Sequence, residues 1–231
     1  MNLVLTLTAN AGVIMEKTDG KVFLLDALHN TPELEFSALT QEMAAQVFHC
    51  LTGKNVAAIL VTHPHPDHYS EELTEKAKEL FSDADMILPW ANSTERYRLY
   101  SRTDYSVMAL PLPHRYAPNY PTVSNYGFWI DLGDGKTVFT SGDADPLSEE
   151  MIRVSEKMHP NVAMLPFLWV TSEACREVLD TLAPKKLILF HLPFENMDPC
   201  RYQHMTESKA KRFYPDAVIL SRFLQSTEFE I

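Results

Sequence analysis

The sequence has little of several features that mark particular classes of protein. It contains three cysteines, Cys50, Cys175 and Cys200, and no two of them form a Cys-x-x-Cys pair. An odd, widely spaced set is typical of reduced thiols and excludes a disulfide framework. No apolar run approaches the roughly 20 residues of a membrane-spanning helix, and no Lys or Arg precedes the short apolar N-terminal stretch, as a secretory signal would require. We therefore expect a cytoplasmic protein that does not enter a membrane.

Basic residues are also scarce. Lys and Arg number 20 against 31 Asp and Glu, which gives a formal net charge of −11 at pH 7. Binding to a phosphate backbone depends on cations that release counterions. The composition therefore excludes a general nucleic-acid binder and an anionic-membrane binder. The expected partner is a small-molecule substrate, and the composition is compatible with a homo-oligomer.

The remaining composition is that of a folded protein. Of the 231 residues, 45% are hydrophobic and 22% are charged, and both values are ordinary for globular domains. A chain of this length buries roughly 70–75% of its unfolded surface, so its core needs no covalent staple. Because the sequence contains no repeat, low-complexity tract or polar linker, we expect a single domain over residues 1–231.

The hydrophobic pattern predicts strands first, and then strands that alternate with helices. Strands are expected at about 2–8, 11–16, 21–26, 56–61, 106–110, 126–131, 137–140, 162–165, 186–190 and 217–220. Helices are expected at about 40–51, from Ser70 onward, and at 148–158, 171–183 and 201–213. Four prolines between 111 and 121 predict a loop there. This order indicates a layered α/β or α+β fold.

Candidate metal ligands follow four of the predicted strands. They are His63, His65, Asp67 and His68 after 56–61, His114 after 106–110, Asp143 after 137–140, and His191 after 186–190. In layered α/β proteins, binding sites collect beyond the carboxyl ends of strands. We therefore expect these seven side chains to meet in one metal site.

The run His63-Pro64-His65-Pro66-Asp67-His68 is the strongest part of this signal. His63 and His65 are two residues apart, so an extended segment can point both imidazoles the same way. The intervening prolines fix φ and remove competing N–H donors. Asp67 and His68 must point elsewhere, which suits a second ion. Imidazole together with carboxylate favours Zn²⁺, and Mn²⁺ and Fe²⁺ accept the same donors.

This series, with Ser141-Gly142-Asp143 and Phe190-His191, resembles the ligand series of the metallo-β-lactamase superfamily. The resemblance extends from the N-terminal strands to about His191, and it is strongest to the branch that contains ascorbate-6-phosphate lactonase-like and related hydrolases. It implies a four-layer αββα sandwich with the site at one edge. It also implies that one metal is bound by His63, His65 and His114, the other by Asp67, His68 and His191, and that Asp143 bridges both.

The resemblance implies a metal-dependent hydrolase. In this hypothesis two divalent metal ions lower the pKa of a bridging water to about 7, and the hydroxide attacks a small ester, lactone or amide. Asp67 and Asp143 are then catalytic as well as ligating residues. The hypothesis needs no protein nucleophile, so the absence of a Gly-x-Ser-x-Gly motif does not count against it. Two alternatives stay open: a phosphodiesterase or nuclease on the same fold, and a non-catalytic metal-binding sensor.

Two further residues are predicted to contact substrate. The stretch from Trp90 to Tyr120 concentrates four arginines, Arg96, Arg98, Arg102 and Arg115, in an otherwise acidic chain. Because arginine binds phosphate and carboxylate groups, we expect an anionic substrate, and Arg115 is the best candidate since it adjoins His114. Trp169, in the apolar segment after 162–165, is the other candidate, and packing in the core is its alternative.

Asp26 and Thr62 are candidates for orienting a ligand rather than binding a metal. Asp26 ends a predicted strand and matches a superfamily position near the site, from which it could hydrogen-bond an imidazole. The alternative is an ordinary aspartate in a turn. Four other histidines, His29, His49, His159 and His204, have no spacing to any partner and are expected on the surface or in the core.

Overall fold

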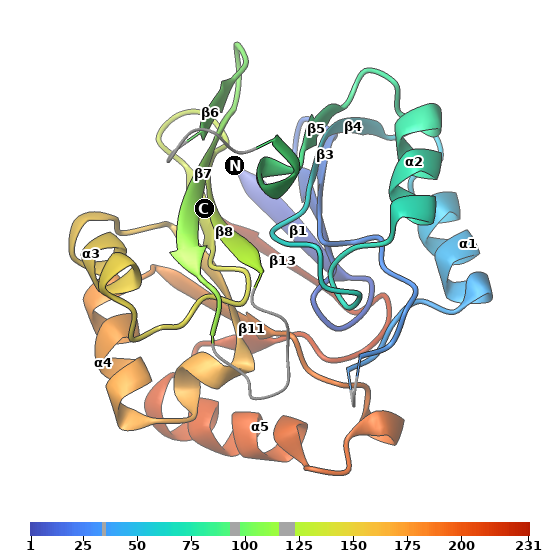
Figure 1. The fold of residues 1–231 in the computed structure, drawn as a ribbon. Helices are drawn as coiled ribbons and strands as arrows, with labels where there is room; N and C mark the ends of the chain where they lie inside the picture. The colour runs from blue at the N-terminus through green and yellow to red at the C-terminus, as the bar shows by residue number, and fades with distance from the viewer. Residues whose placement is uncertain (34–35, 93–97, 116–122) are drawn as a thin grey trace. The chain divides into compact units, whose positions relative to one another are not determined.

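The computed structural model describes residues 1–33, 36–92, 98–115 and 123–231, and these form two compact units (Figure 1). Unit 1 comprises Met1–Leu88, His191–Gln203 and Leu220–Ile231, whereas unit 2 comprises Pro89–Phe190 and His204–Ile219. Each unit contains one mixed β-sheet. Within the described ranges, no helix combines the length and the apolar character needed to cross a membrane.

Unit 1 is built on a six-stranded sheet with the order β13-β1-β2-β3-β4-β5. Its strands are β1 (Asn2–Leu7), β2 (Val13–Lys17), β3 (Lys21–Leu25), β4 (Asn55–Leu60), β5 (Asp85–Ile87) and β13 (Ser226–Glu230). β1 to β3 form an antiparallel meander, and β3 to β5 run parallel. The turn between β2 and β3 contains Gly20 at φ 83°, a conformation that glycine adopts without steric cost.

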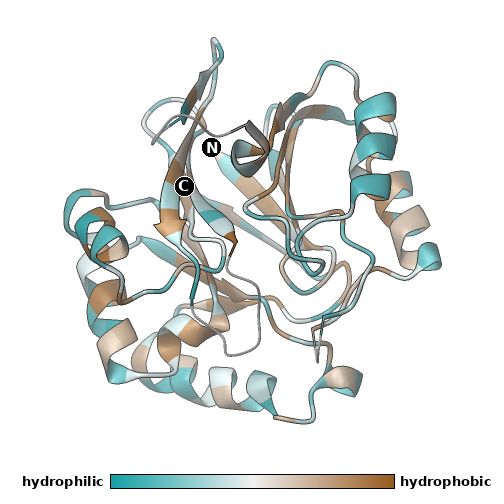
Figure 2. Ribbon diagram, viewed as in Figure 1, coloured by the Kyte–Doolittle hydropathy of each residue, from teal (hydrophilic) through white to brown (hydrophobic). Residues whose placement is uncertain are grey.

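Helices α1 (Gln41–Cys50) and α2 (Glu71–Leu80) cover this sheet beside β3, β4 and β5 (Figure 1). Each begins at a capping side chain: Thr40 accepts a hydrogen bond from the Met43 N–H, and Ser70 accepts one from the Leu73 N–H. Hydrophilic residues dominate α2, whereas β3 and β4 are largely hydrophobic (Figure 2). The buried sides of both helices therefore join the strands in one core, which includes Leu24, Ala44, Val47, Ile59, Leu73 and Ala77.

Unit 2 is built on a seven-stranded sheet with the order β12-β11-β10-β9-β8-β7-β6. Its strands are β6 (Arg98–Ser101), β7 (Ser106–Pro113), β8 (Ser124–Asp131), β9 (Thr137–Thr140), β10 (Val162–Pro166), β11 (Lys186–Phe190) and β12 (Val218–Ile219). β6 to β9 are antiparallel, and β9 to β12 are parallel. Helices α3 (Glu149–Lys157), α4 (Glu173–Leu182) and α5 (Tyr202–Phe213) follow successive strands of the parallel half. Strands that alternate with helices in this way confirm the expected α/β class.

Three short 3₁₀ segments complete the described elements: η1 (Pro89–Asn92), η2 (Phe167–Val170) and η3 (Glu195–Met197). η2 contributes to the core of unit 2 together with α3, α4 and α5. The buried members of this core include Phe139, Met151, Leu165, Val170, Leu179, Leu189 and Ala210.

The loop predicted from residue 111 onward is wrong at its start, because β7 continues through Pro111 to Pro113. Among the described residues, β6 pairs with β7 only as far as Ala109, so no described strand continues this pairing beside the last residues of β7. Pro111 and Pro113 are two residues apart, and their nitrogens face the same edge of the strand. Proline is tolerated there because no described strand on that edge requires an N–H donor. The rest of the predicted loop, from 116 onward, lies outside the described residues.

Candidate metal centre

Five of the seven predicted ligands belong to unit 1. Four follow the buried end of β4, and the fifth directly follows β11, where the chain returns to unit 1. Their exposed fractions are all small: His63 0%, His65 6%, Asp67 4%, His68 2% and His191 4%. Buried polar side chains are stable only when their hydrogen-bonding groups are satisfied, so the partners of these residues define the site.

Asp67, His68 and His191 form a compact donor set. One ligand atom from each residue lies within 4.8 Å of the others. The two Nε2 atoms of His68 and His191 are 3.0 Å apart, and Oδ2 of Asp67 is 3.6 Å from the Nε2 of His191. Two imidazoles and one carboxylate are a donor set that Zn²⁺ takes in proteins. The residues that the superfamily resemblance assigns to one metal are therefore chemically suited to hold a divalent cation.

Asp26 and Thr62 determine which ring nitrogen carries the proton in two histidines, His63 and His68. The backbone N–H and the hydroxyl of Thr62 donate to Asp26 at 2.8 and 2.7 Å. Since the hydroxyl proton is used there, Thr62 Oγ1 accepts the hydrogen bond from Nδ1 of His63 at 2.9 Å. Asp26 Oδ2 accepts from Nδ1 of His68 at 2.9 Å. Both rings therefore keep their proton on Nδ1 and leave Nε2, the atom facing away from these partners, available to bind a metal.

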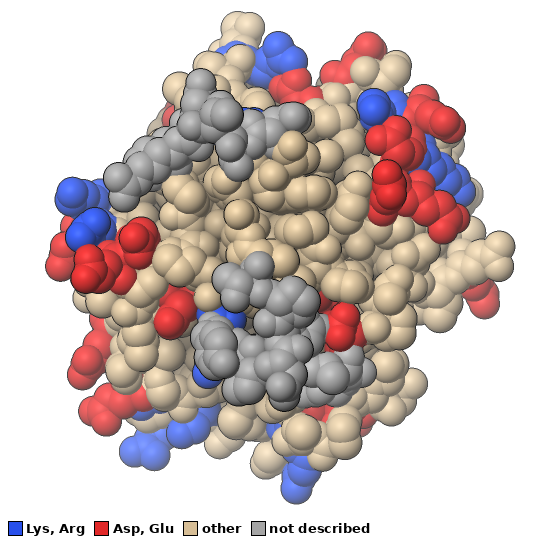
Figure 3. All heavy atoms as spheres, viewed as in Figure 1, with Lys and Arg blue, Asp and Glu red and all other residues tan. Residues whose placement is uncertain are grey.

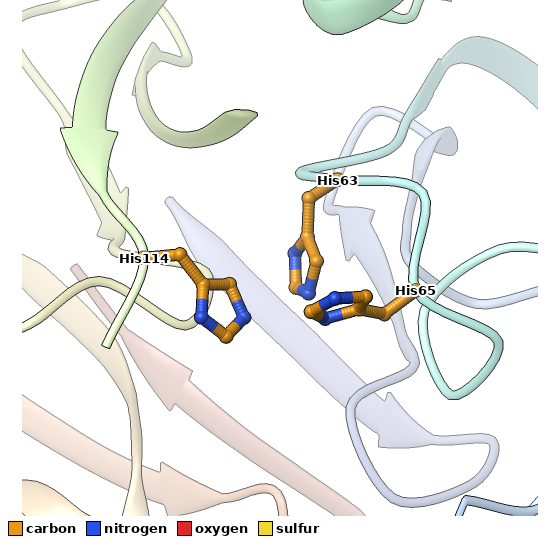
Figure 4. A group of neighbouring side chains, drawn as sticks. All are labelled: His63, His65 and His114. Atoms are coloured by element: carbon orange, nitrogen blue, oxygen red, sulfur yellow. The ribbon is translucent and has the colours of Figure 1, made fainter. Parts of the chain in front are cut away.

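The rings of His63 and His65 lie close together, as their two-residue spacing allows. The two rings lie edge to face, with centroids 4.7 Å apart, on the loop that follows β4 (Figure 4). His63 also lies against His68, with ring centroids 4.0 Å apart. The same short loop thus supplies imidazoles to more than one position of the predicted site.

His114 and Asp143 belong to unit 2 and lie next to each other there. His114 follows the end of β7 (Figure 4), and an isolated antiparallel bridge joins it to Ala144. Its Nε2 is 3.9 Å from Oδ2 of Asp143. Nδ1 of His114 donates to the carbonyl of Arg115 at 2.7 Å, so the unprotonated Nε2 is on the side of Asp143. The structure therefore pairs two predicted ligands from different strand ends.

Asn125 holds these strand ends together, and sequence reasoning missed it. Its buried side chain donates to the carbonyls of Leu112 and Ser141 at 3.3 and 3.1 Å, and its Oδ1 accepts from the Asp143 N–H at 3.0 Å. It thereby links β7, β8 and the segment that follows β9. The available signal was an amide directly before the largely apolar run 126–130 of the strand, since a buried amide needs partners in the core.

The two predicted substrate residues have different surroundings. Arg115 is exposed, and its backbone N–H donates to the carbonyl of Asp143 at 2.8 Å. Trp169 is 1% exposed within the hydrophobic core of unit 2, which agrees with the alternative that this ring packs in the core. Arg98 and Arg102 lie in and just after β6, whereas Arg96 lies outside the described residues. The role of these residues in substrate binding stays a prediction.

His29 is more closely connected to the ligands than its isolated position in the sequence suggested. It is completely buried in unit 1. Burial lowers the pKa of its imidazole to about 3, and the electrostatic influence of the nearby imidazoles of His68 and His191 acts in the same direction. His29 is therefore a neutral imidazole at pH 7, which avoids a buried positive charge beside the predicted cation.

Comparison with known proteins supports the fold. No family model matches the chain. A UPF0173 metal-dependent hydrolase from Pyrococcus abyssi is 27% identical over an alignment that covers 68% of this chain and 77% of the relative. Igni18, a metallo hydrolase from Ignicoccus hospitalis, matches all of this chain and all of its own with a TM-score of 0.63 and 20% identity. The metallo-β-lactamase fold protein YhfI from Bacillus subtilis matches 99% of this chain and 100% of its own with a TM-score of 0.64 and 11% identity. The chain is therefore similar to known metal-dependent hydrolases, and it has the metallo-β-lactamase fold.

Proposed function

We propose that this chain is a metal-dependent hydrolase that holds two divalent cations, with Zn²⁺ as the first candidate and Mn²⁺ and Fe²⁺ as others. The observation that carries the proposal is the buried set of Asp67, His68 and His191, whose ligand atoms lie within 4.8 Å of one another. The sequence relative from Pyrococcus abyssi is named a metal-dependent hydrolase, and this supports the same general activity here.

The proposed ligand set follows the superfamily pattern. His63, His65 and His114 are assigned to one cation, Asp67, His68 and His191 to the other, and Asp143 to both. The adjacency of His114 and Asp143 within unit 2 supports their assignment to a common function. In His63, His68 and His114 the Nδ1 proton is held in a hydrogen bond. This supports the assignment further, because each ring then offers the lone pair of Nε2 to a metal.

Two divalent cations in such a site would supply Lewis acidity and lower the pKa of water toward neutrality. The residues of the chain would orient the ligands and accept protons. Asp26 and Thr62 would keep the imidazoles in one tautomer, and the carboxylates of Asp67 and Asp143 would accept protons as well as bind metal. The proposed substrates are small esters, lactones or amides, and the exposed Arg115 would bind an anionic group on them. We propose a cytoplasmic location for this activity.

The distribution of charge supports a small substrate over nucleic acid. On the face shown in Figure 3, acidic and basic side chains of the described residues are interspersed, and the basic ones form no continuous surface. The whole chain has a net charge of −11. Association with a phosphate backbone requires several cations that act together, and the described residues visible in Figure 3 form no such basic group.

The test compares Asp143→Ala with Asp145→Ala, a neighbouring aspartate that is not a proposed ligand. Metal content and the hydrolysis of a chromogenic lactone and a chromogenic phosphodiester are measured side by side. We expect Asp143→Ala to lose bound metal and to lower chelator-sensitive lactone hydrolysis by more than about 100-fold, the upper range for loss of a supporting residue. Asp145→Ala should keep both.

Two results would contradict this proposal. If Asp143→Ala retained two metal ions and the full rate, its assigned role would be wrong. If the wild-type protein hydrolysed the phosphodiester alone, the substrate class would be wrong and a phosphodiesterase would replace the esterase or lactonase.

A further inference from the structure

The loop between β1 and β2 is buried in a way that is unusual for a hairpin loop. All five residues from Thr8 to Gly12 are buried, although connecting loops normally run over the protein surface. The loop closes on itself through a hydrogen bond from the Thr8 N–H to the Gly12 carbonyl at 2.8 Å. Its side chains and backbone groups must therefore find their partners inside unit 1.

Asn10, in the middle of this loop, contacts two of the proposed ligands. Its side-chain amide donates to Oδ2 of Asp67 at 3.1 Å, and its carbonyl accepts from the His191 N–H at 3.0 Å. Asn10 itself is completely buried. His191 has φ 60°, a left-handed conformation that a histidine keeps only when its surroundings hold it. The hydrogen bond to Asn10 is one of the contacts that hold it.

The loop is also packed against the segment that orients His68. Thr8 Oγ1 donates to the carbonyl of Ala27 at 2.9 Å. A Cβ atom at Gly12 would lie 2.9 Å from the carbonyl oxygen of Asp26 and 2.9 Å from Cα of Ala27. Only glycine fits at this distance. The loop therefore touches the Asp26, Asp67 and His191 segments at once.

We propose that Asn10 is a positioning residue for the metal site, which fixes the Asp67 carboxylate and the His191 backbone in the geometry that binds a cation. This inference rests on the proposed function, because it takes Asp67 and His191 as ligands. The amide is a neutral donor, so it orients the carboxylate and leaves its negative charge for the metal. Oδ2 keeps further lone-pair capacity, since a carboxylate oxygen can accept more than one interaction.

The oxygen of Asp67 that Asn10 contacts indicates which of the two proposed metal sites Asn10 supports. Oδ2 of Asp67, the atom that Asn10 contacts, is also the atom that lies 3.6 Å from Nε2 of His191 and 3.9 Å from Nε2 of His68. Without the amide, the carboxylate could rotate and present its oxygens differently to the two imidazoles. We therefore expect loss of Asn10 to weaken the site of Asp67, His68 and His191, and to leave the other metal site largely unaffected.

The experiment measures the two Zn²⁺ affinities by competition with a chromogenic chelator, together with the visible spectrum of the Co²⁺-loaded protein. Asn10→Ala removes the amide, and Asn10→Leu removes it while keeping a side chain branched at Cγ. The control is Thr74→Ala, a buried polar residue on α2 in the same unit that contacts none of the proposed ligands through its hydroxyl. We expect both Asn10 variants to weaken one Zn²⁺ equivalent by about 10–100-fold and to change the Co²⁺ spectrum. Thr74→Ala should do neither.

The possible failures can be told apart. If wild-type protein binds two equivalents and both Asn10 variants bind them equally well, the role of Asn10 is overturned and the proposed function stands. If both equivalents weaken together in the Asn10 variants and in Thr74→Ala, the effect is a general loss of structure and the positioning role is also overturned. If wild-type protein binds no cation that Asp67→Ala or His191→Ala removes, the proposed function fails and the role of Asn10 fails with it.

Discussion

Thr62 connects two orienting interactions, because its hydroxyl donates to Asp26 and accepts from His63. Thr62→Val keeps the shape of the side chain and removes this link. His63 then loses the acceptor for its Nδ1 proton, so either tautomer can form. We expect metal affinity to fall by about 10–100-fold and the free energy of unfolding to fall by about 1–3 kcal/mol, the cost of an unsatisfied buried group. Metal titration and denaturant unfolding would check both values.

Thr62→Ser is the matched control because it retains the hydroxyl. It should recover most of the metal affinity, although the lost methyl group lowers stability. Equal affinities in Thr62→Val and wild-type protein would show that His63 does not need this partner.

The sequence indicated the proposed ligands more completely than the residues that support them, because most of the proposed ligands lie close together in the chain. His63 to His68 lie within six residues, so their spacing alone indicates how an extended segment can present them. Asn10 and Asp67 are 57 residues apart, and Asn125 reaches Asp143 only because β8 and β9 pair. Such contacts depend on the whole sheet, and no local pattern encodes them.

At the scale of elements, the β1–β2 loop depends on Gly12. A Cβ atom at this position would lie 2.2 Å from Oγ1 of Thr8 as well as against the backbone of Asp26 and Ala27. We expect Gly12→Ala to lower the free energy of unfolding by about 1–3 kcal/mol through overpacking. Because the loop carries Asn10, the substitution should also weaken metal binding. Gly53→Ala is the comparison: that glycine has φ 74° and open space around it, so its replacement strains the backbone locally.

Thermal unfolding and Zn²⁺ titration of the two glycine variants would separate stability from binding. Both variants lose stability, but only Gly12→Ala should lose metal affinity. Wild-type affinity in Gly12→Ala would mean that the loop moves without disturbing Asp67 and His191.

Helices and strands were predicted best where a side chain close in sequence determines where the element begins or ends. α2 begins after Ser70 because that side chain caps the helix, and the sequence shows this directly. β5, β6 and β13 were not expected. β13 forms by pairing with β1 from the opposite end of the chain, with Phe229 opposite Leu3. A strand whose partner is so distant is not joined to it by a turn, so the sequence contains no turn motif that predicts the pair. The prolines of β7 suggested a loop for a similar reason: the sequence does not show where the described pairing of β6 with β7 ends.

At the scale of the whole molecule, the path of the chain gives His191 a special place. The chain leaves unit 1 after Leu88 and returns to it at His191, and this residue meets Asp67 and His68 of the first segment. A cation held by these three residues would therefore join two segments of unit 1 that are separated by most of unit 2 in the sequence. Anything that binds the folded state and not the unfolded chain stabilises the fold by mass action.

Removal of metal should therefore lower the melting temperature of the protein. With free Zn²⁺ at about 100 times its dissociation constant, one bound ion contributes about 2.7 kcal/mol. For a chain of this size each kcal/mol corresponds to about 2–4 °C, so we expect a chelator to lower Tm by about 5–10 °C and added Zn²⁺ to restore it. His191→Ala should show a smaller shift, because only the cation assigned to the other ligands would still bind, whereas His204→Ala, an exposed histidine on α5, should show the full one. A chelator-dependent shift that is the same in wild type and His191→Ala would place the stabilising cation elsewhere, because the segment that begins at His191 would then gain nothing from the metal.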